Sequence, residues 1–245
     1  MIVITKEQIE AFRNGSYTAF EQRLLEKLAE RYPERIKACG EAPALGMVRL
    51  GVERAKSRGL AAEEDLLRYL SMMLLFGSEW EQDPQLPWAT NALAENDTPA
   101  PARMARLWER ALAAQARVMG ADDGLYRAAL RSLAGKSVED VAKLASRSQR
   151  DLADQLAAMW PARFGDTGES VYRELTRRAV DACRPFDLVD RWSVVLMVEL
   201  MLLFGTGFLS DPLHEWAHAA LKDPQAGVDQ KLARLLEGAQ QRIPA

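Results

Sequence analysis

The stretch Met72–Leu93, MMLLFGSEWEQDPQLPWATNAL, is matched further along the chain by Leu200–Leu221, LMLLFGTGFLSDPLHEWAHAAL, at an offset of 128. Eleven of the 22 aligned pairs are identical, and the alignment needs no gap. Unrelated segments of this length would share about one or two identities, so the match indicates an internal repeat.

The same offset of 128 aligns residues on both sides of this stretch. Tyr32-Pro33 falls on Trp160-Pro161, and MARLWERA at 104–111 falls on LARLLEGA at 232–239. The repeated unit then extends from about residue 5 to 120 and again from about 133 onward. We therefore predict a tandem duplication, with one helical unit in residues 1–120 and a second in residues 121–245.

Apolar residues within each unit recur at helical spacing. One such run predicts a helix over about 62–76 that ends at Gly77. Asp83-Pro84, repeated as Asp211-Pro212, places an Asp at the N-cap and a Pro where its missing N–H has no cost. We expect further helices at about 41–57, 102–119 and 228–240. No segment alternates with period two, so the predicted fold class is all-α with about five helices per unit.

Composition excludes several classes of protein. The chain has 32 Lys and Arg against 35 Asp and Glu, a net charge of −3, which argues against a nucleic-acid binder. Cys39 and Cys183 form no CxxC pattern, which fits a reducing compartment, and MIVITKEQIEAF at the start does not resemble a signal peptide. The most apolar stretch, Trp192–Phe204, is too short to span a membrane. We expect a cytoplasmic protein that binds neither nucleic acid nor membrane.

Glu199 interrupts this most apolar stretch, where its counterpart in the first unit is Ser71. A carboxylate there is either a solvent-facing residue of an amphipathic helix or a buried acid with a raised pKa. We favour the solvent-facing position.

The one motif with catalytic potential is His214-Glu215-Trp216-Ala217-His218, which has the HExxH pattern. On a helix, the two histidines can ligate one Zn²⁺ while Glu215 takes a proton from the bound water. Glu237, on a later predicted helix, is the candidate third ligand. Over these residues the pattern resembles that of the thermolysin-like metallopeptidases, and it implies a zinc-dependent hydrolase or peptidase.

Three features weigh against this zinc site. The first unit has LPWAT at the matching positions 86–90, so the helix is predicted without a metal. Glu237 matches Glu109, so the duplication already accounts for it. Pro212 places His214 in the first helical turn, where a positive charge is disfavoured. We therefore assign no catalytic residue, metal or cofactor, and keep the zinc hydrolase as the alternative.

Residues present in both units are interpreted first as structural, including LLFG, Asp-Pro and the pair Trp88 and Trp216. The functional alternative is that these tryptophans line equivalent grooves for a protein partner. We name Trp80, Trp88, Phe208 and Trp216 as candidate partner-binding residues. The dissimilar segments 79–82 and 207–210 are the candidate partner-reading loops.

Four motifs in the first unit suggest a family. They are ITKEQIEAF at 4–12, Tyr32-Pro33, LLFG at 74–77 and DPQLPW at 83–88. With these motifs, residues 4–93 resemble small all-helical proteins encoded beside type VI secretion spike (VgrG) and PAAR-tip effector genes in Gram-negative bacteria. The second unit resembles them more loosely. The resemblance implies a non-catalytic accessory protein that binds a secreted toxin or spike component, either as an adaptor or chaperone or as an immunity protein.

Overall fold

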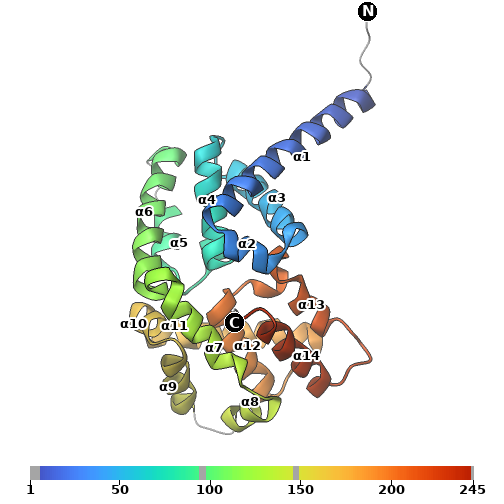
Figure 1. Cartoon of the computed structure of the whole chain (residues 1–245). Coiled ribbons are helices and arrows are strands. Elements are labelled where there is room, and N and C mark those ends of the chain that lie inside the picture. The colour runs from blue at the N-terminus through green and yellow to red at the C-terminus, as the bar shows by residue number, and fades with distance from the viewer. Residues whose placement is uncertain (1–5, 94–97, 146–148, 244–245) are drawn as a thin grey trace, which may run out of the picture.

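A computed structural model describes residues 6–93, 98–145 and 149–243 of the chain. These residues form 14 α-helices and five short 3-10 helices, and no strand occurs among them (Figure 1). The predicted all-α class is therefore confirmed. None of the described helices is long and apolar enough to cross a membrane.

The elements follow one another along the chain without long connections. The first half contains α1 (Lys6–Arg31), α2 (Pro33–Cys39), α3 (Glu41–Ser57), α4 (Glu63–Phe76), η1 (Trp80–Gln82), α5 (Pro87–Leu93) and α6 (Ala100–Met119). The second half begins with η2 (Ala121–Asp123), α7 (Gly124–Ala134), α8 (Val138–Ala145), α9 (Gln149–Met159), α10 (Pro161–Thr167) and α11 (Glu169–Cys183). It ends with η3 (Arg184–Phe186), α12 (Arg191–Phe204), η4 (Phe208–Ser210), η5 (Pro212–His214), α13 (Glu215–Leu221) and α14 (Val228–Gln240).

The helix bounds repeat along the chain at the offset of the sequence match. At this offset, the first residues of α2, α3, α4, η1, α5 and α6 fall on those of α10, α11, α12, η4, α13 and α14, respectively. The helices expected at about 41–57, 62–76, 102–119 and 228–240 correspond to α3, α4, α6 and α14 within two residues. Each of these helices has a glycine as the cap residue at one end, and none has a side-chain N-cap hydrogen bond.

α4 and α12 form the centre of the two halves, and most of their residues are buried. α3 and α6 pack on α4, whereas α11 and α8 pack on α12. α6 also packs on α10, so it joins the halves. The buried apolar side chains form one continuous cluster from Leu24 to Ala239, so the two halves share a core.

The two halves meet where α4 and α12 end. Gly77 and Gly205 have φ angles of +92° and +88°, which only glycine adopts readily. A Cβ on Gly77 would lie 2.9 Å from the carbonyl oxygen of Phe204, and one on Gly205 would lie 2.8 Å from that of Phe76. Glycine is therefore required at both positions for two reasons, the backbone turn and the close approach of the two chain segments.

Asp83 and Asp211 connect the halves reciprocally. The Oδ2 atom of Asp83 accepts a hydrogen bond from the backbone N–H of Thr206 at 2.9 Å, and that of Asp211 accepts one from Ser78 at 2.7 Å. Each Oδ1 atom also accepts a local bond, from Gln85 or Leu213, both at 2.9 Å. Each aspartate thus fixes its own turn and the first residues after the opposite glycine.

Glu199 is fully buried, so the expectation of a solvent-facing position was wrong. Its Oε1 atom accepts a hydrogen bond from Lys136 Nζ, while Oε2 has no hydrogen-bond partner among the residues that the structure describes. Burial raises the pKa of this carboxyl, and the Lys136 charge opposes the rise. The reason is that α8, α11 and α14 all pack against α12, which leaves this helix without a solvent-facing side.

Candidate functional site

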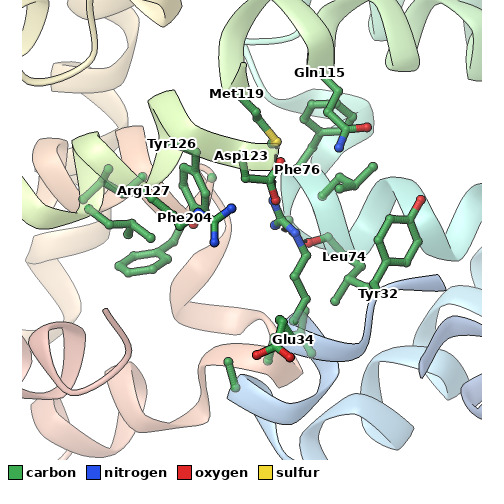
Figure 2. A pocket seen from close by; sticks show the side chains of 18 of the residues that line it. Tyr32, Glu34, Leu74, Phe76, Gln115, Met119, Asp123, Tyr126, Arg127 and Phe204 are labelled. Carbon is green, nitrogen blue, oxygen red and sulfur yellow. Dashed lines mark hydrogen bonds and ion pairs between the residues drawn. The ribbon is translucent and has the colours of Figure 1, made fainter. Parts of the chain in front are cut away.

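A cavity of about 670 Å³ opens at the junction of the two halves, and we call it the cleft. Its lining comes from both halves and includes Tyr32, Arg35, Phe76, Tyr126, Trp160, Arg163, Phe204 and His214. Figure 2 shows Tyr126, Arg127 and Phe204 on one side of it and Tyr32, Leu74 and Gln115 on the other. A cavity of this size can hold a small ligand or several side chains of a protein segment.

Two arginines and two aromatic rings form a continuous stack along the cleft. The Arg35 guanidinium lies 5.3 Å from the centre of the Tyr126 ring, whose centre is 5.2 Å from that of Trp160. Arg163, on α10, lies 4.9 Å from the ring of Trp160, the residue before this helix. The Trp160 indole N–H donates to the carbonyl of Val118 at 2.7 Å, so the stack is anchored to α6.

The two arginines occupy equivalent positions in the halves, related by the offset of the repeat, but their surroundings differ. Arg35 forms an ion pair with Asp123 at 2.7 Å. Arg163 is 5% exposed and has no ion pair among the described residues, and its Nε and Nη1 atoms are buried without a hydrogen-bond partner. Burial lowers the pKa of Arg163, because the charged guanidinium is removed from water.

The charges along the cleft are unequal. Its arginines are Arg31, Arg35, Arg127, Arg163 and Arg242, and its carboxylates are Glu34, Asp122 and Asp123. Burial lowers the pKa of His214 and raises that of the Cys39 thiol to about 11, so neither carries a charge at neutral pH. The cleft is therefore positive within a chain whose net charge is −3.

The residues of the HExxH pattern point to different surroundings. His214 lies in η5, before the first residue of α13, and its ring packs 4.9 Å from that of Phe204. Its Nδ1 atom accepts from the Trp216 indole at 3.4 Å. His218 is exposed and lies 5.8 Å from the ring of Phe186. The two imidazoles thus have separate aromatic neighbours.

The remaining residues of the zinc hypothesis do not complete a ligand set. Glu215 and Glu237 are both exposed, and Glu237 accepts a hydrogen bond from Gln241 at 3.3 Å. Within the described ranges, no group of three or more His, Cys, Asp or Glu side chains is placed to hold a metal ion. The structure therefore assigns no metal-binding geometry to the motif.

Two of the aromatic residues expected to contact a partner are inside the protein. Trp80 and Phe208 are fully buried, so neither presents an exposed surface to a partner in this structure. Trp80 packs against Tyr69, with ring centres 5.2 Å apart, and Phe208 packs against Phe204 at 6.4 Å. The physical reason is that η1 and η4 turn inward at the junction between the halves.

Trp88 and Trp216 are half-buried and support the walls of the cleft. Trp88 packs edge-on against Phe76 at 5.6 Å, and Trp216 packs edge-on against Phe204 at 6.0 Å. Phe76 and Phe204 line the cleft directly. Arg242, which also lines the cleft, lies 4.7 Å from the Trp216 ring. These tryptophans therefore position cleft residues.

The segments 79–82 and 207–210 face each other. A Cβ on Gly207 would overlap the Cβ and Cγ atoms of Glu79, so the two segments touch across the junction. Glu79 also pairs with Arg54 at 2.6 Å. These contacts occupy at least part of both segments within the protein itself.

Sequence reasoning missed the arginines of the cleft, although a signal was present. The offset of 128 aligns YPERIKACG with WPARFGDTG and thereby Arg35 with Arg163. Tyr126 had no such signal, because it lies between the aligned parts of the two units.

Comparison of the chain with protein-family models, curated proteins and solved structures finds no match. The chemistry of the cleft is therefore inferred from its own residues.

Proposed function

We propose that this protein is a non-catalytic accessory protein that binds a protein partner in the cleft between its halves. The observation that carries the proposal is a cavity built by both halves, with half-buried Arg35 and Tyr126 in its wall and buried Trp160 and Arg163 packed beside them. Arginine, tyrosine and tryptophan are the residue types that contribute most binding energy in protein interfaces.

The rigidity of the stack supports this function. Trp160 is fixed by its hydrogen bond to Val118, and Arg35 is held by its ion pair with Asp123. Side chains that are already ordered lose little conformational entropy when a partner binds. The cleft is thus suited to recognition by a preformed surface.

We further propose that the two halves arose by tandem duplication, with units in residues 1–120 and 121–245. The matched helix starts and the reciprocal contacts of Gly77 with Gly205 and of Asp83 with Asp211 support this origin. In this proposal, the residues common to both units build the junction. The residues that differ adapt the cleft to one ligand, including Asp123, which pairs with Arg35.

The proposed biological role follows from the resemblance in the first unit. The partner is a secreted toxin or a component of the secretion spike, met in the cytoplasm of the producing bacterium. The protein acts there either as an adaptor or chaperone, or as an immunity protein.

Two exposed apolar residues provide a matched test. Leu112 is 44% exposed and lines the cleft, whereas Val189 is 83% exposed and is not among the residues that line it. The immobilised full chain, as wild type, Leu112→Glu or Val189→Glu, is incubated with lysate of the producing bacterium. We expect a protein retained by the wild type and by Val189→Glu but not by Leu112→Glu.

The retained protein is then purified and titrated calorimetrically against the same three chains. A complex that forms with wild type and Val189→Glu but is weakened at least tenfold by Leu112→Glu supports binding in the cleft. Retention of the same proteins by all three chains, or of none by the wild type, contradicts it. Loss of the partner's toxicity on co-expression identifies an immunity protein, whereas increased solubility or secretion of an active partner identifies a chaperone or adaptor.

A further inference from the structure

The guanidinium of Arg163 is a charged group that forms no ion pair with the described part of the chain. It lines the cleft, yet its Nε and Nη1 atoms are buried without a hydrogen-bond partner among the described residues. A buried charge without a partner is unfavourable, and native proteins commonly satisfy such groups with a counter-ion, water or a ligand.

The carboxylates that act on Arg163 electrostatically have other partners. Asp166 accepts a hydrogen bond from Arg117 at 2.9 Å. Asp83 accepts from the backbone N–H groups of Thr206 and Gln85. Neither forms an ion pair with Arg163, so no carboxylate among the described residues accepts a hydrogen bond from its guanidinium.

The matched arginine of the first half shows what kind of group fits this position. Arg35 is the counterpart of Arg163 at the offset of 128, also lies over an aromatic ring, that of Tyr126, and pairs with the carboxylate of Asp123. Stacking covers one face of each guanidinium and leaves its N–H donors in the plane, where a carboxylate accepts from them. The matched arginine thus indicates a carboxylate rather than an apolar group.

The other charges of the cleft favour a singly charged anion. Its five arginines exceed its three carboxylates, so a negative group is attracted. Glu34, Asp122 and Asp123 on the same walls would repel a doubly charged phosphate more than a carboxylate.

We propose that the cleft contains a carboxylate-binding site centred on Arg163, and that its ligand is an acidic side chain of the protein partner. This inference rests on the proposed function in one respect, the source of the carboxylate. The same arginine would also bind a free small-molecule carboxylate. Bound there, the acidic group pairs with Arg163 as Asp123 pairs with Arg35.

The probe is N-acetylglutamate α-amide, whose side chain carries its single charge, and the uncharged control is N-acetylglutamine α-amide. The reporter is the indole N–H signal of Trp160 in nitrogen-15 NMR spectra of the full chain, since this ring lies 4.9 Å from Arg163. We expect a saturable shift with the glutamate probe and none with the glutamine probe.

Three variants identify the arginine responsible. Arg163→Met removes the charge but keeps an apolar chain over Trp160. It should lower the affinity for the glutamate probe at least tenfold. Arg163→Lys keeps the charge without the planar donors. Its affinity for the glutamate probe should lie between those of wild type and Arg163→Met. Arg173→Met, at a position whose side chain is 79% exposed on α11, should bind like wild type. Absence of a saturable shift in the wild type, or equal binding by folded Arg163→Met, overturns the site.

The partner obtained in the lysate experiment separates this inference from the proposed function. A partner that requires the cleft but binds wild type and Arg163→Met equally overturns the carboxylate site and leaves the proposed function intact. A glutamate probe that binds through Arg163, with no protein that requires the cleft, supports the site with a free carboxylate as its source and contradicts the proposed function. Weakening of both the probe and the partner by Arg163→Met supports both.

Discussion

The two halves of this protein have matching helix starts but different side-chain environments. α2–α6 and α10–α14 begin at positions related by one constant offset, and both halves turn at a glycine after LLFG. Yet the matched residues Arg35 and Arg163 differ in partners, since only Arg35 has an ion pair among the described residues. The matched residues Ser71 and Glu199 are both buried, but Glu199 is charged and forms an ion pair with Lys136.

This comparison distinguishes residues that connect the two halves at the junction from residues that do not. Gly77, Gly205, Asp83 and Asp211 act reciprocally across the junction, so each half supplies the group that the other needs. Reciprocal contacts require the same residue in both halves, and this explains why these residues are shared. Arg163 has no such contact, which leaves it available to a ligand.

The largest expected effect comes from the glycines of the junction. Gly77→Ala or Gly205→Ala adds a Cβ to an unfavourable φ and places it against the opposite backbone, so we expect a loss of about 4 kcal/mol of unfolding free energy. Gly168 has a similar φ of +76° but no atom within 4 Å of an added Cβ. Gly168→Ala should therefore cost about 2 kcal/mol, the strain alone. Urea unfolding measures both; equal losses would mean that the close approach does not matter.

The aspartates of the junction should have the next largest effect. Asp83→Ala or Asp211→Ala leaves buried backbone N–H groups in both halves without an acceptor, at a cost of about 2–3 kcal/mol each. Asp223 is the matched control, since it accepts from the backbone N–H of Gln225 at 3.0 Å and pairs with Arg234, both within the second half. Asp223→Ala should cost much less in the same urea experiment, because water can replace bonds at this accessible turn. Similar losses at all three positions would assign the effect to the local turn.

The matched arginines should respond with opposite signs. Arg35→Met leaves Asp123 without its partner and should lower the unfolding free energy by about 2 kcal/mol. Arg163→Met removes a buried charge that has no partner among the described residues and should raise it by about 1 kcal/mol. Calorimetric unfolding of the two variants tests this contrast. Destabilisation of similar size by both would show that Arg163 is paired in solution.

The smallest effect concerns the pH dependence of stability. Because burial raises the pKa of Glu199, the folded state holds this proton more tightly than the unfolded state. Stability from this group therefore falls as pH rises above the ordinary value of 4.5 and toward the raised pKa of the folded state. Urea unfolding between about pH 4 and 8 should show a flatter profile for Glu199→Gln than for wild type.

Glu174 is the control of opposite sign. Its pKa is lowered to about 2 by hydrogen bonds from Arg177 and Arg178. Its contribution is present above the ordinary value of 4.5 and is lost as pH falls toward 2. Glu174→Gln should therefore change the acidic end of the profile only. A Glu199→Gln profile parallel to that of wild type would contradict the raised pKa.

Much of the fold could be read from local signals. Apolar spacing predicted α4, and the bounds of α3, α6 and α14 were also placed within two residues. The burial of Trp80 and Phe208 could not be read from the motifs that contain them. An aromatic residue in a sequence does not reveal which side of a short 3-10 turn faces the core.

The all-helical class, the match between the two parts of the chain and the ends of the main helices could all be read from the amino-acid sequence. The class and the helix ends depend on residues within one or two turns of each other, so neighbouring positions in the chain carry the information. Only the tertiary structure decided that Asp83 reaches Thr206, that Glu199 is buried beside Lys136, and that Arg163 lines a cleft without a partner among the described residues. Each of these depends on how segments far apart in the chain pack together, because burial and pairing are properties of the assembled core.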